Sequence, residues 1–197
     1  MNDRSLALFD FDGTIISKDS FIQFIIFTNG KVKSYLGFII LTPVFLLMYF
    51  KVISNKKTKE IFLFYFFRNK KINELIYKGN LFKTELDKWC KPKAIQKINW
   101  HKTRNDMIVI VSASSDIWIG AWCDSHNIEM ITTKLETVND KLTGKIIGEN
   151  CNGFEKVRRI NEKFDLKNYK EIYAYGDSPG DLLMLNMANF SYYQKFK

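Results

Sequence analysis

The stretch "LALFDFDGTI", residues 6–15, constrains the fold more than any other part of the chain. Its first four residues are bulky and apolar, as in a strand buried on both faces of a parallel sheet. Asp10 and Asp12 follow, and Gly13 permits a tight turn. Ligands of open parallel sheets bind outside the carboxyl ends of the strands, and residues two apart on an extended segment point the same way. We therefore expect both carboxylates to lie in one ligand-binding crevice.

Two carboxylates this close repel each other unless a cation or a shared proton compensates. Magnesium takes carboxylate oxygens as ligands and bridges protein to phosphate groups. A solvated turn is the alternative, because Asp-Gly is common in turns. Large apolar residues on both sides of the pair disfavour that alternative. The pair therefore predicts a site for a divalent cation and a phosphorylated ligand.

The rest of the chain alternates between predicted strands and helices, except for one long helical stretch. The strand pattern stops after Thr14 and returns near residue 100. Beyond it we expect strands at 107–114 and 171–178, a short strand and a hairpin turning at Asn139-Asp140 within 129–148, helices at 116–127, 153–164 and 181–188, and an edge strand at 190–196. This pattern predicts an α/β core with a parallel sheet and helices on both faces, from residues 1–14 and 101–197. Residues 15–100 are predicted to form an all-helical insert.

Composition indicates the cellular compartment in which the protein is expected. The chain has 197 residues and three scattered cysteines, which argues for a reducing compartment rather than a disulfide framework. His101 and His126 are isolated and fit surface or packing positions better than metal ligands. No secretory signal pattern is visible, so we expect a cytoplasmic protein.

Polar residues recur at the ends of the later predicted strands. Ser112 ends one strand, Asp177 and Asp181 follow another, and Lys156 lies in the first turn of a helix. Together with the first two aspartates they would supply carboxylates, a hydroxyl and an ammonium to one crevice. Such a set suits phosphoryl transfer, in which catalysis is mostly positioning and charge stabilisation. A carboxylate can also act as the nucleophile and form an aspartyl-phosphate.

These segments, "FDFDGTI", "VSAS", "GFEK" and "GDSPGD", resemble in their order the four motifs of the haloacid dehalogenase-like (HAD) hydrolases. The resemblance extends over residues 6–190 and implies a HAD-like Rossmannoid core and a magnesium-dependent phosphatase. It implies that Asp10 is the nucleophile and Asp12 the general acid/base. It further implies that the phosphoryl group is bound by Thr14, Ser112, Ala113 and Lys156, and that magnesium is held by Asp10, the Asp12 carbonyl and Asp177, with Asp181 in support.

An insert between the first two motifs resembles the C1 cap of subfamily IB, which includes phosphoserine phosphatases and bacterial phosphatidylglycerophosphatase C. Caps of this family select the substrate. Phosphoserine phosphatases use a cap glutamate and a cap arginine, and Asp19 and Arg68 are the candidates here. Arg68 lies in an aromatic and basic run without a convincing motif match, which disfavours phosphoserine as the substrate.

The insert is both apolar and basic. Ser34 to Phe50 contains no charged residue, and residues 14–100 contain fifteen lysines and Arg68 against five acidic residues. A single membrane span there would place Asp10 on the opposite side from Ser112, and Pro43 would kink it. The segment is therefore expected either to pack inside the cap or to enter one leaflet. Basic clusters beside an apolar surface are typical of proteins that bind anionic leaflets.

These features predict a phosphatase of a membrane lipid phosphate, such as phosphatidylglycerophosphate, located peripherally at the inner face of the membrane. A soluble, phosphoserine phosphatase-like enzyme of small metabolites is the main alternative. A non-catalytic membrane-binding protein on a HAD scaffold is a more remote one, because all motif residues are present. Nucleic acid is not an expected partner, since no RNA-binding or helix-turn-helix signature is found.

Overall fold

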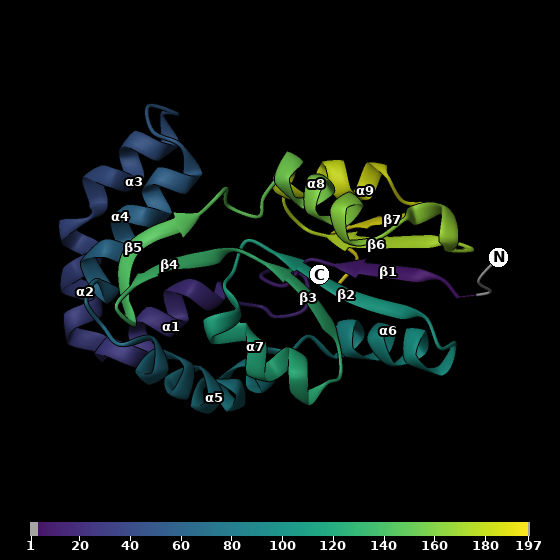
Figure 1. Ribbon diagram of the computed structural model, residues 1–197, viewed down its shortest axis with the longest axis horizontal. Helices are drawn as coiled ribbons and strands as arrows, with labels where there is room; N and C mark the ends of the chain where they lie inside the picture. The colour runs from purple at the N-terminus through teal and green to yellow at the C-terminus, as the bar shows by residue number, and fades with distance from the viewer. Residues whose placement is uncertain (1–3, 197) are drawn as a thin grey trace.

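Five parallel strands form the central sheet, in the order β3-β2-β1-β6-β7 (Figure 1). The computed structural model describes residues 4–196. The strands are β1 (Leu6–Phe9), β2 (Met107–Ser112), β3 (Glu129–Thr132), β6 (Ile172–Gly176) and β7 (Phe190–Tyr193). The predicted parallel α/β core is confirmed, and β7 is the predicted edge strand. The chain changes direction across the sheet beside β1, which is where such sheets bind ligands.

Helices cover both faces of this sheet, because successive strand residues point to opposite faces and the residues on both faces are apolar. Leu6 and Leu8 of β1 pack with α8 (Phe154–Lys163) and α9 (Leu182–Asn186). Ala7 and Phe9 face α6 (Pro92–Thr103) and α7 (Asp116–Ser125) on the other side. Two short 3-10 helices, η1 (Leu166–Asn168) and η2 (Pro179–Asp181), flank β6. The carboxyl ends of the strands are therefore held in place by a sheet that is buried on both faces.

Five helices between β1 and α6 are called the cap helices below. They are α1 (Ser20–Asn29), α2 (Lys31–Ile40), α3 (Thr42–Tyr49), α4 (Asn55–Phe67) and α5 (Ile72–Trp89). Asp19 caps α1 by accepting a hydrogen bond from the amide of Ile22 at 2.9 Å. Gly79 lets α5 approach α7, since a Cβ there would lie 1.9 Å from the carbonyl oxygen of Ile117.

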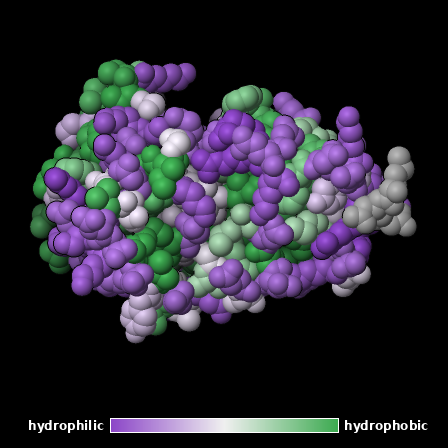
Figure 2. Space-filling view, in the orientation of Figure 1, coloured by the Kyte–Doolittle hydropathy of each residue, from purple (hydrophilic) through white to green (hydrophobic). Residues whose placement is uncertain are grey.

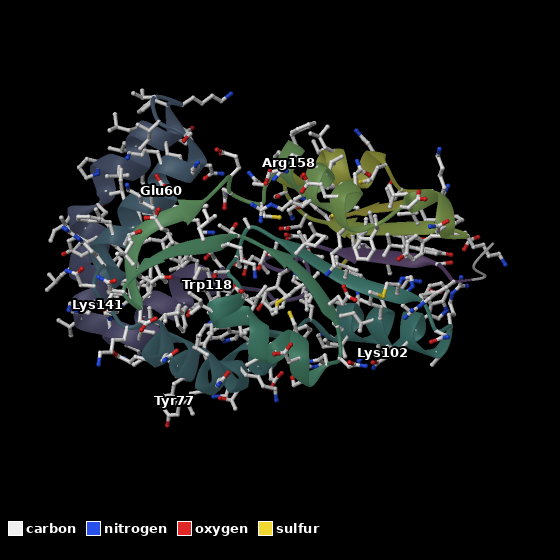
Figure 3. All side chains as sticks on the ribbon, viewed as in Figure 1. Glu60, Tyr77, Lys102, Trp118, Lys141 and Arg158 are labelled. Atoms are coloured by element: carbon white, nitrogen blue, oxygen red, sulfur yellow. The ribbon has the colours of Figure 1, made fainter. Side chains whose placement is uncertain are left out.

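Two observations bear on the predicted division of the chain at residue 100. The helix α6 packs against β2 of the core sheet, and Pro92 at its start separates it from α5. The hairpin of β4 (Lys134–Val138) and β5 (Lys141–Ile147) extends from the core and lies along α4 (Figure 1). In Figure 3, Glu60 on α4 lies beside β5, and its carboxylate accepts a hydrogen bond from the amide of Ile146 at 3.2 Å. The cap helices therefore share their layer with two strands that follow them in sequence.

The hairpin turns where the sequence predicts it. Asn139 and Asp140 both have positive φ, at 49° and 59°, which a tight two-residue hairpin turn requires. The amide of Ile72 donates to the carbonyl of Asp140 at 2.8 Å, so the turn is fixed to the start of α5.

The apolar segment 34–50 forms two helices that are bent by 51° at Leu41. Pro43 lies in the first turn of α3, where a missing amide proton costs nothing. None of the residues of α3 is buried, so this helix is not the core of the cap. Within residues 4–196 no single helix has both the length and the apolar composition of a membrane span, although α2 and α3 together meet that test.

Candidate active site

Asp10 directly follows β1 and is held at the centre of the sheet edge. Its amide donates to the carbonyl of Tyr175 on β6 at 2.9 Å, which continues the sheet by one residue. Its carboxylate oxygen Oδ1 accepts a hydrogen bond from Lys156 Nζ at 2.6 Å. The same ammonium bonds Asp181 Oδ1 at 2.6 Å, and all three side chains are buried. The motif residues from the start and the end of the chain therefore meet in one cluster.

The pKa values of these three side chains are shifted in different directions. Burial disfavours the Lys156 ammonium, but the two carboxylates outweigh it and raise the pKa of Lys156. Burial raises the pKa of Asp10 to about 7, against the lowering effect of Lys156. Burial also opposes ionisation of Asp181, yet Lys156 and the hydroxyl of Ser178 lower its pKa. Lys156 thus holds its charge, while Asp10 is a carboxylate whose ionisation depends on further positive charge.

Asp12 lies two residues on, but its carboxylate has different partners. Oδ1 accepts from the amide of Ser20 at 2.7 Å, and Oδ2 accepts from the hydroxyl of Ser114 at 2.6 Å. Ser20 in turn contacts Ser114 at 2.8 Å and accepts from the indole N–H of Trp118 at 3.1 Å. Burial raises the pKa of Asp12 to about 6. A carboxyl group fixed in this way and titrating near neutrality is suited to give and take a proton.

Asp177 follows β6 and faces Asp10 across the turn at Gly13. The hydroxyl of Thr14 bridges the two carboxylates, at 3.3 Å from Asp10 Oδ2 and 3.2 Å from Asp177 Oδ1. Gly13 has a φ of 78°, and a Cβ there would lie 2.2 Å from Asp177 Oδ2. Only glycine therefore permits this approach of the two strand ends.

Three carboxylates converge in a way that fits a hard divalent cation. One oxygen from each of Asp10, Asp177 and Asp181 lies within 4.8 Å of the others. Hard cations such as magnesium take carboxylate oxygens, and one positive side chain, Lys156, does not neutralise three carboxylates. The carboxylate of Asp12 lies outside this group, and its predicted contribution through the backbone carbonyl stays a prediction. The donor set therefore fits magnesium, with these three aspartates as the holding residues.

A pocket of about 380 Å³ lies between the sheet edge and the cap helices. Its core side includes Asp10, Asp12 and Lys156, together with Ser112 at the end of β2 and Ala113 directly after it. The buried Ser112 hydroxyl accepts a hydrogen bond from the amide of Ser114 at 3.0 Å. The cap side is lined by Asp19, Phe21, Ile22, Phe45, Met48, Asn55, Thr58, Lys59 and Phe62. Three of the four predicted phosphate-binding residues, Ser112, Ala113 and Lys156, thus lie on one wall. The fourth, Thr14, does not line the pocket, and its hydroxyl contacts the carboxylates of Asp10 and Asp177 instead.

The two predicted substrate-selecting residues have different positions. Asp19 lines the pocket. Arg68 does not: it is the C-cap of α4, and its guanidinium lies over the ring of Phe64 at 4.5 Å. The start of α4 borders the pocket, so a residue nine positions beyond Lys59 lies roughly 13 Å further along the helix axis. The structure therefore does not place Arg68 at the site.

Sequence reasoning missed four residues that the site uses. Ser20, Ser114 and Trp118 form the hydrogen-bond chain that fixes Asp12, and Lys59 lines the pocket from α4. Ser114 is the last residue of "VSAS", two positions after Ser112, which is the signal that could have pointed to it. Lys59 looked like one member of a surface lysine cluster, and nothing in the sequence distinguishes it from Lys56 or Lys57.

The central strand of the parallel sheet leads into a buried carboxylate, a second carboxylate is fixed beside it, and a lysine is paired with the first. This arrangement suits a hydrolase of the phosphatase type. The chain belongs to the haloacid dehalogenase-like hydrolase family, whose model matches residues 7–186. The predicted family, fold and enzyme class are confirmed by this match.

The chain is also similar to individual proteins of known sequence or structure. Protein CicA of Caulobacter vibrioides is 29% identical over 195 residues, which cover 98% of this chain and 86% of that protein. A protein with unknown function from Bordetella pertussis Tohama I superposes with a TM-score of 0.82 at 21% identity, over 95% of this chain and 88% of the other. A phosphoserine phosphatase solved as a phospho-aspartyl intermediate analogue gives a TM-score of 0.63 at 18% identity, over 96% and 86%. At these identities the two solved structures establish the shared fold.

Proposed function

We propose that the protein is a magnesium-dependent phosphomonoester hydrolase that acts through an aspartyl-phosphate, and that its substrate is a membrane lipid phosphate such as phosphatidylglycerophosphate. The observation that favours a lipid is the composition of the pocket. The chamber that contains Asp10 and Lys156 is lined on its cap side by Phe45 and Met48 of α3. No residue of α3 is buried, so the catalytic chamber borders an exposed apolar helix.

The chemistry follows from the positions of the two aspartates. An oxygen of Asp10 attacks phosphorus while the bond from phosphorus to the ester oxygen breaks, and Asp12 gives its proton to the leaving alcohol. Water then attacks phosphorus of the aspartyl-phosphate, Asp12 takes a proton from that water, and inorganic phosphate and free Asp10 result. Lys156 and Ser112 hold the phosphoryl oxygens. Magnesium, when bound by Asp10, Asp177 and Asp181, supplies charge compensation for the phosphoryl group.

An exposed apolar surface on α2, α3 and the turn after them supports contact with a leaflet. Figure 2 shows apolar residues gathered at the tip of α3 and along the outer edge of the cap helices. Ile39 is 69% exposed, and the surface, called the apolar face below, comprises Leu36, Ile39, Ile40, Leu46, Leu47 and Phe50. Patches of this kind on one protein mark an interaction site. Lys33 precedes the face and Lys51 follows it, and both are exposed.

Charge complementarity favours an anionic leaflet over a protein partner as the occupant. Apolar insertion combined with basic residues is the two-signal arrangement of peripheral membrane proteins. The basic stretch after Phe50 contributes less than its sequence suggests, because Lys56 pairs with Glu149 at 2.8 Å and Lys59 lies in the pocket. Lys33 and Lys51 are therefore the lysines to test.

The test is sedimentation with vesicles of phosphatidylglycerol and phosphatidylcholine, using the double variant Lys33→Glu/Lys51→Glu. We expect its affinity for the vesicles to fall by at least about 30-fold, because each lysine near the surface contributes about 1 kcal/mol and the variant removes two. The difference should shrink in 1 M salt, where the Debye length is about 3 Å. Turnover of a short soluble phosphate ester should not change. The control Lys93→Glu/Lys167→Glu makes the same change in net charge at exposed positions of the core and should bind as wild type does.

A wild type that ignores anionic vesicles, or a core control that loses binding equally, would contradict the lipid proposal. The soluble alternative would then be preferred. That alternative, a phosphoserine-like metabolite as substrate, is favoured by one observation, the position of Asp19 in the pocket.

A further inference from the structure

The pocket contains two lysine ammonium groups, and they differ in their partners. Lys156 is bonded to two carboxylates, at 2.6 Å each. Lys59 forms no ion pair with any carboxylate of the described residues, 4–196. Its Nζ donates to the carbonyl oxygen of Ala113 at 2.6 Å. Lys59 is therefore a positive charge in the pocket that the protein itself does not neutralise through a direct contact.

The position of Lys59 is fixed by the surrounding groups. Its Nζ lies 5.3 Å from the ring centre of Phe21 and 5.8 Å from that of Trp118, so two aromatic rings border the ammonium. Ala113 adjoins Ser112, the predicted phosphoryl ligand, and consecutive Cα atoms are about 3.8 Å apart. The ammonium thus lies beside the phosphoryl-binding loop but on the cap side of the pocket. Three donor positions on the ammonium leave room for a ligand in addition to the Ala113 carbonyl.

Burial lowers the pKa of Lys59, and the charges of Asp12 and Asp19 act against this. A partly desolvated ammonium favours binding of an anion, because the anion restores the stabilisation that water no longer gives. The scissile phosphoryl group already has Lys156 and the metal site to compensate its charge. Lys59 is therefore available for a second anionic group of the substrate, one that is joined to the phosphoryl group by only a few bonds.

We propose that Lys59 is a specificity-determining residue that binds a second anionic group of the substrate, a phosphodiester adjacent to the scissile phosphomonoester. This inference rests on the proposed function, since a phosphodiester is the group that links such a headgroup to acyl chains. The wall formed by Phe45, Met48 and Phe62 lies on the same cap side and would receive the first carbons of those chains. Lys59 would thereby separate lipid phosphates with two anionic groups from those with one.

The test uses Lys59→Met and four soluble substrates that vary two properties independently. Dihexanoyl phosphatidylglycerophosphate has acyl chains and a second anion, and dihexanoyl phosphatidate has the chains alone. Glycerophosphoglycerophosphate, the deacylated form with one phosphodiester and one phosphomonoester, has the second anion alone, and glycerol 3-phosphate has neither. We expect Lys59→Met to lower kcat/KM about 10- to 100-fold, mainly through KM, for the two substrates with a second anion. The other two should change less than about threefold. Lys59→Arg should keep most of the preference.

Lys57→Met is the matched control, because Lys57 is exposed on the same helix. Its kinetics should equal those of wild type with all four substrates. An equal loss with every substrate would show that Lys59 only holds the cap to the Ala113 loop, and no loss would show that it binds nothing; either result overturns the inference. The acyl-chain comparison in wild type tests the lipid proposal separately, because a preference for chains and a preference for the second anion are read from different substrate pairs.

Discussion

Asp10 and Asp12 lie two residues apart and have the same side chain, yet their surroundings give them different chemistry. Asp10 contacts Lys156 and faces two further carboxylates, so it sits where phosphorus and a cation would be held. Asp12 is fixed by Ser20 of α1 and by Ser114 of the loop after β2, outside the carboxylate cluster. The difference comes from the turn after β1, which sends one side chain toward β6 and the other toward the loop after β2. Under the proposed mechanism, the same residue type would therefore supply the nucleophile, Asp10, and the general acid/base, Asp12.

The variant Asp10→Asn should lose turnover by at least about 10³-fold, because an amide does not attack phosphorus. Without metal its melting temperature should equal or exceed that of wild type. Burial raises the pKa of Asp10 to about 7, so above the ordinary carboxyl pKa the ionised side chain costs stability that the amide does not. Magnesium should raise the melting temperature of wild type and leave the variant nearly unchanged. Thermal unfolding in EDTA and in magnesium measures both effects.

The exposed Asp124→Asn serves as the control, since it removes one carboxylate outside the cluster and should respond to magnesium as wild type does. Equal stabilisation of Asp10→Asn and wild type by magnesium would contradict the assignment of Asp10 as a metal-holding residue. Substantial turnover in the variant would contradict its role as nucleophile.

At the scale of elements, α8 places Lys156 by means of an ion-pair network on its first turn. Glu155 is buried and accepts from Arg158 Nε at 2.8 Å and from Arg159 Nε at 2.6 Å. Arg159 also donates to the carbonyl of Thr132 at 2.6 Å, which joins α8 to the end of β3. The hydrogen bond from Arg158 lowers the pKa of Glu155 to about 2, although burial opposes this. The carboxylate thus links the helix that holds the catalytic lysine to the sheet.

Glu155→Gln should therefore destabilise the fold by about 1–2 kcal/mol at pH 7, a value reduced from the full linkage because Arg158 is partly exposed. A lowered carboxyl pKa contributes stability above the unfolded pKa of about 4.5, and this contribution is lost as pH falls toward about 2. The stability difference between variant and wild type should shrink over that interval. Urea unfolding at pH 7, 5 and 3 measures it.

Glu162→Gln is the matched control, because Glu162 pairs with the same Arg158 at an exposed position. We expect it to cost less than about 0.5 kcal/mol. A Glu155→Gln effect that is absent at pH 7, or that stays constant down to pH 3, would contradict this account of α8.

Sequence patterns predicted some elements well and others poorly, for physical reasons. The buried strands and the Asn139-Asp140 turn follow from local rules, and both were found. For the segment 34–50 the sequence is compatible with both a cap core and entry into a leaflet, because an apolar composition is common to both. Its burial depends on what packs against it, and the structure leaves α3 without a buried residue. The contacts of the hairpin with α4 depend on tertiary packing that no local pattern records.

The same distinction applies to the site. Motif spacing located Asp10, Asp12, Ser112, Lys156 and Asp177, because each follows a strand or begins a helix. The sequence does not show that Lys59 reaches the pocket while Arg68 does not, because both are basic residues of one apolar and basic stretch. Only the direction of α4 relative to the sheet places the first in the pocket and the second away from it.

At the scale of the whole molecule, the cap helices and the core form two walls of one chamber. The core wall provides the phosphoryl chemistry, and the cap wall provides apolar residues and Lys59. The hydrogen bonds from Ser20 to Asp12 and from Lys59 to Ala113 join the two walls, so the cap helices help to fix the position of the Asp12 carboxylate. The exposed apolar face lies on the cap, next to the chamber. Phosphate hydrolysis and membrane contact would therefore be performed by adjacent surfaces.

The most direct test of the central claim is to trap the covalent intermediate and locate it. Enzyme with magnesium is mixed with dihexanoyl phosphatidylglycerophosphate, quenched in acid within the first turnover, and treated with borohydride, which reduces an aspartyl-phosphate to homoserine. Peptide mass spectrometry then identifies the modified residue. The proposed mechanism predicts homoserine at residue 10 in wild type and none in Asp10→Asn. Phosphate release that continues with no modified aspartate, or with modification at Asp12 instead, would contradict it.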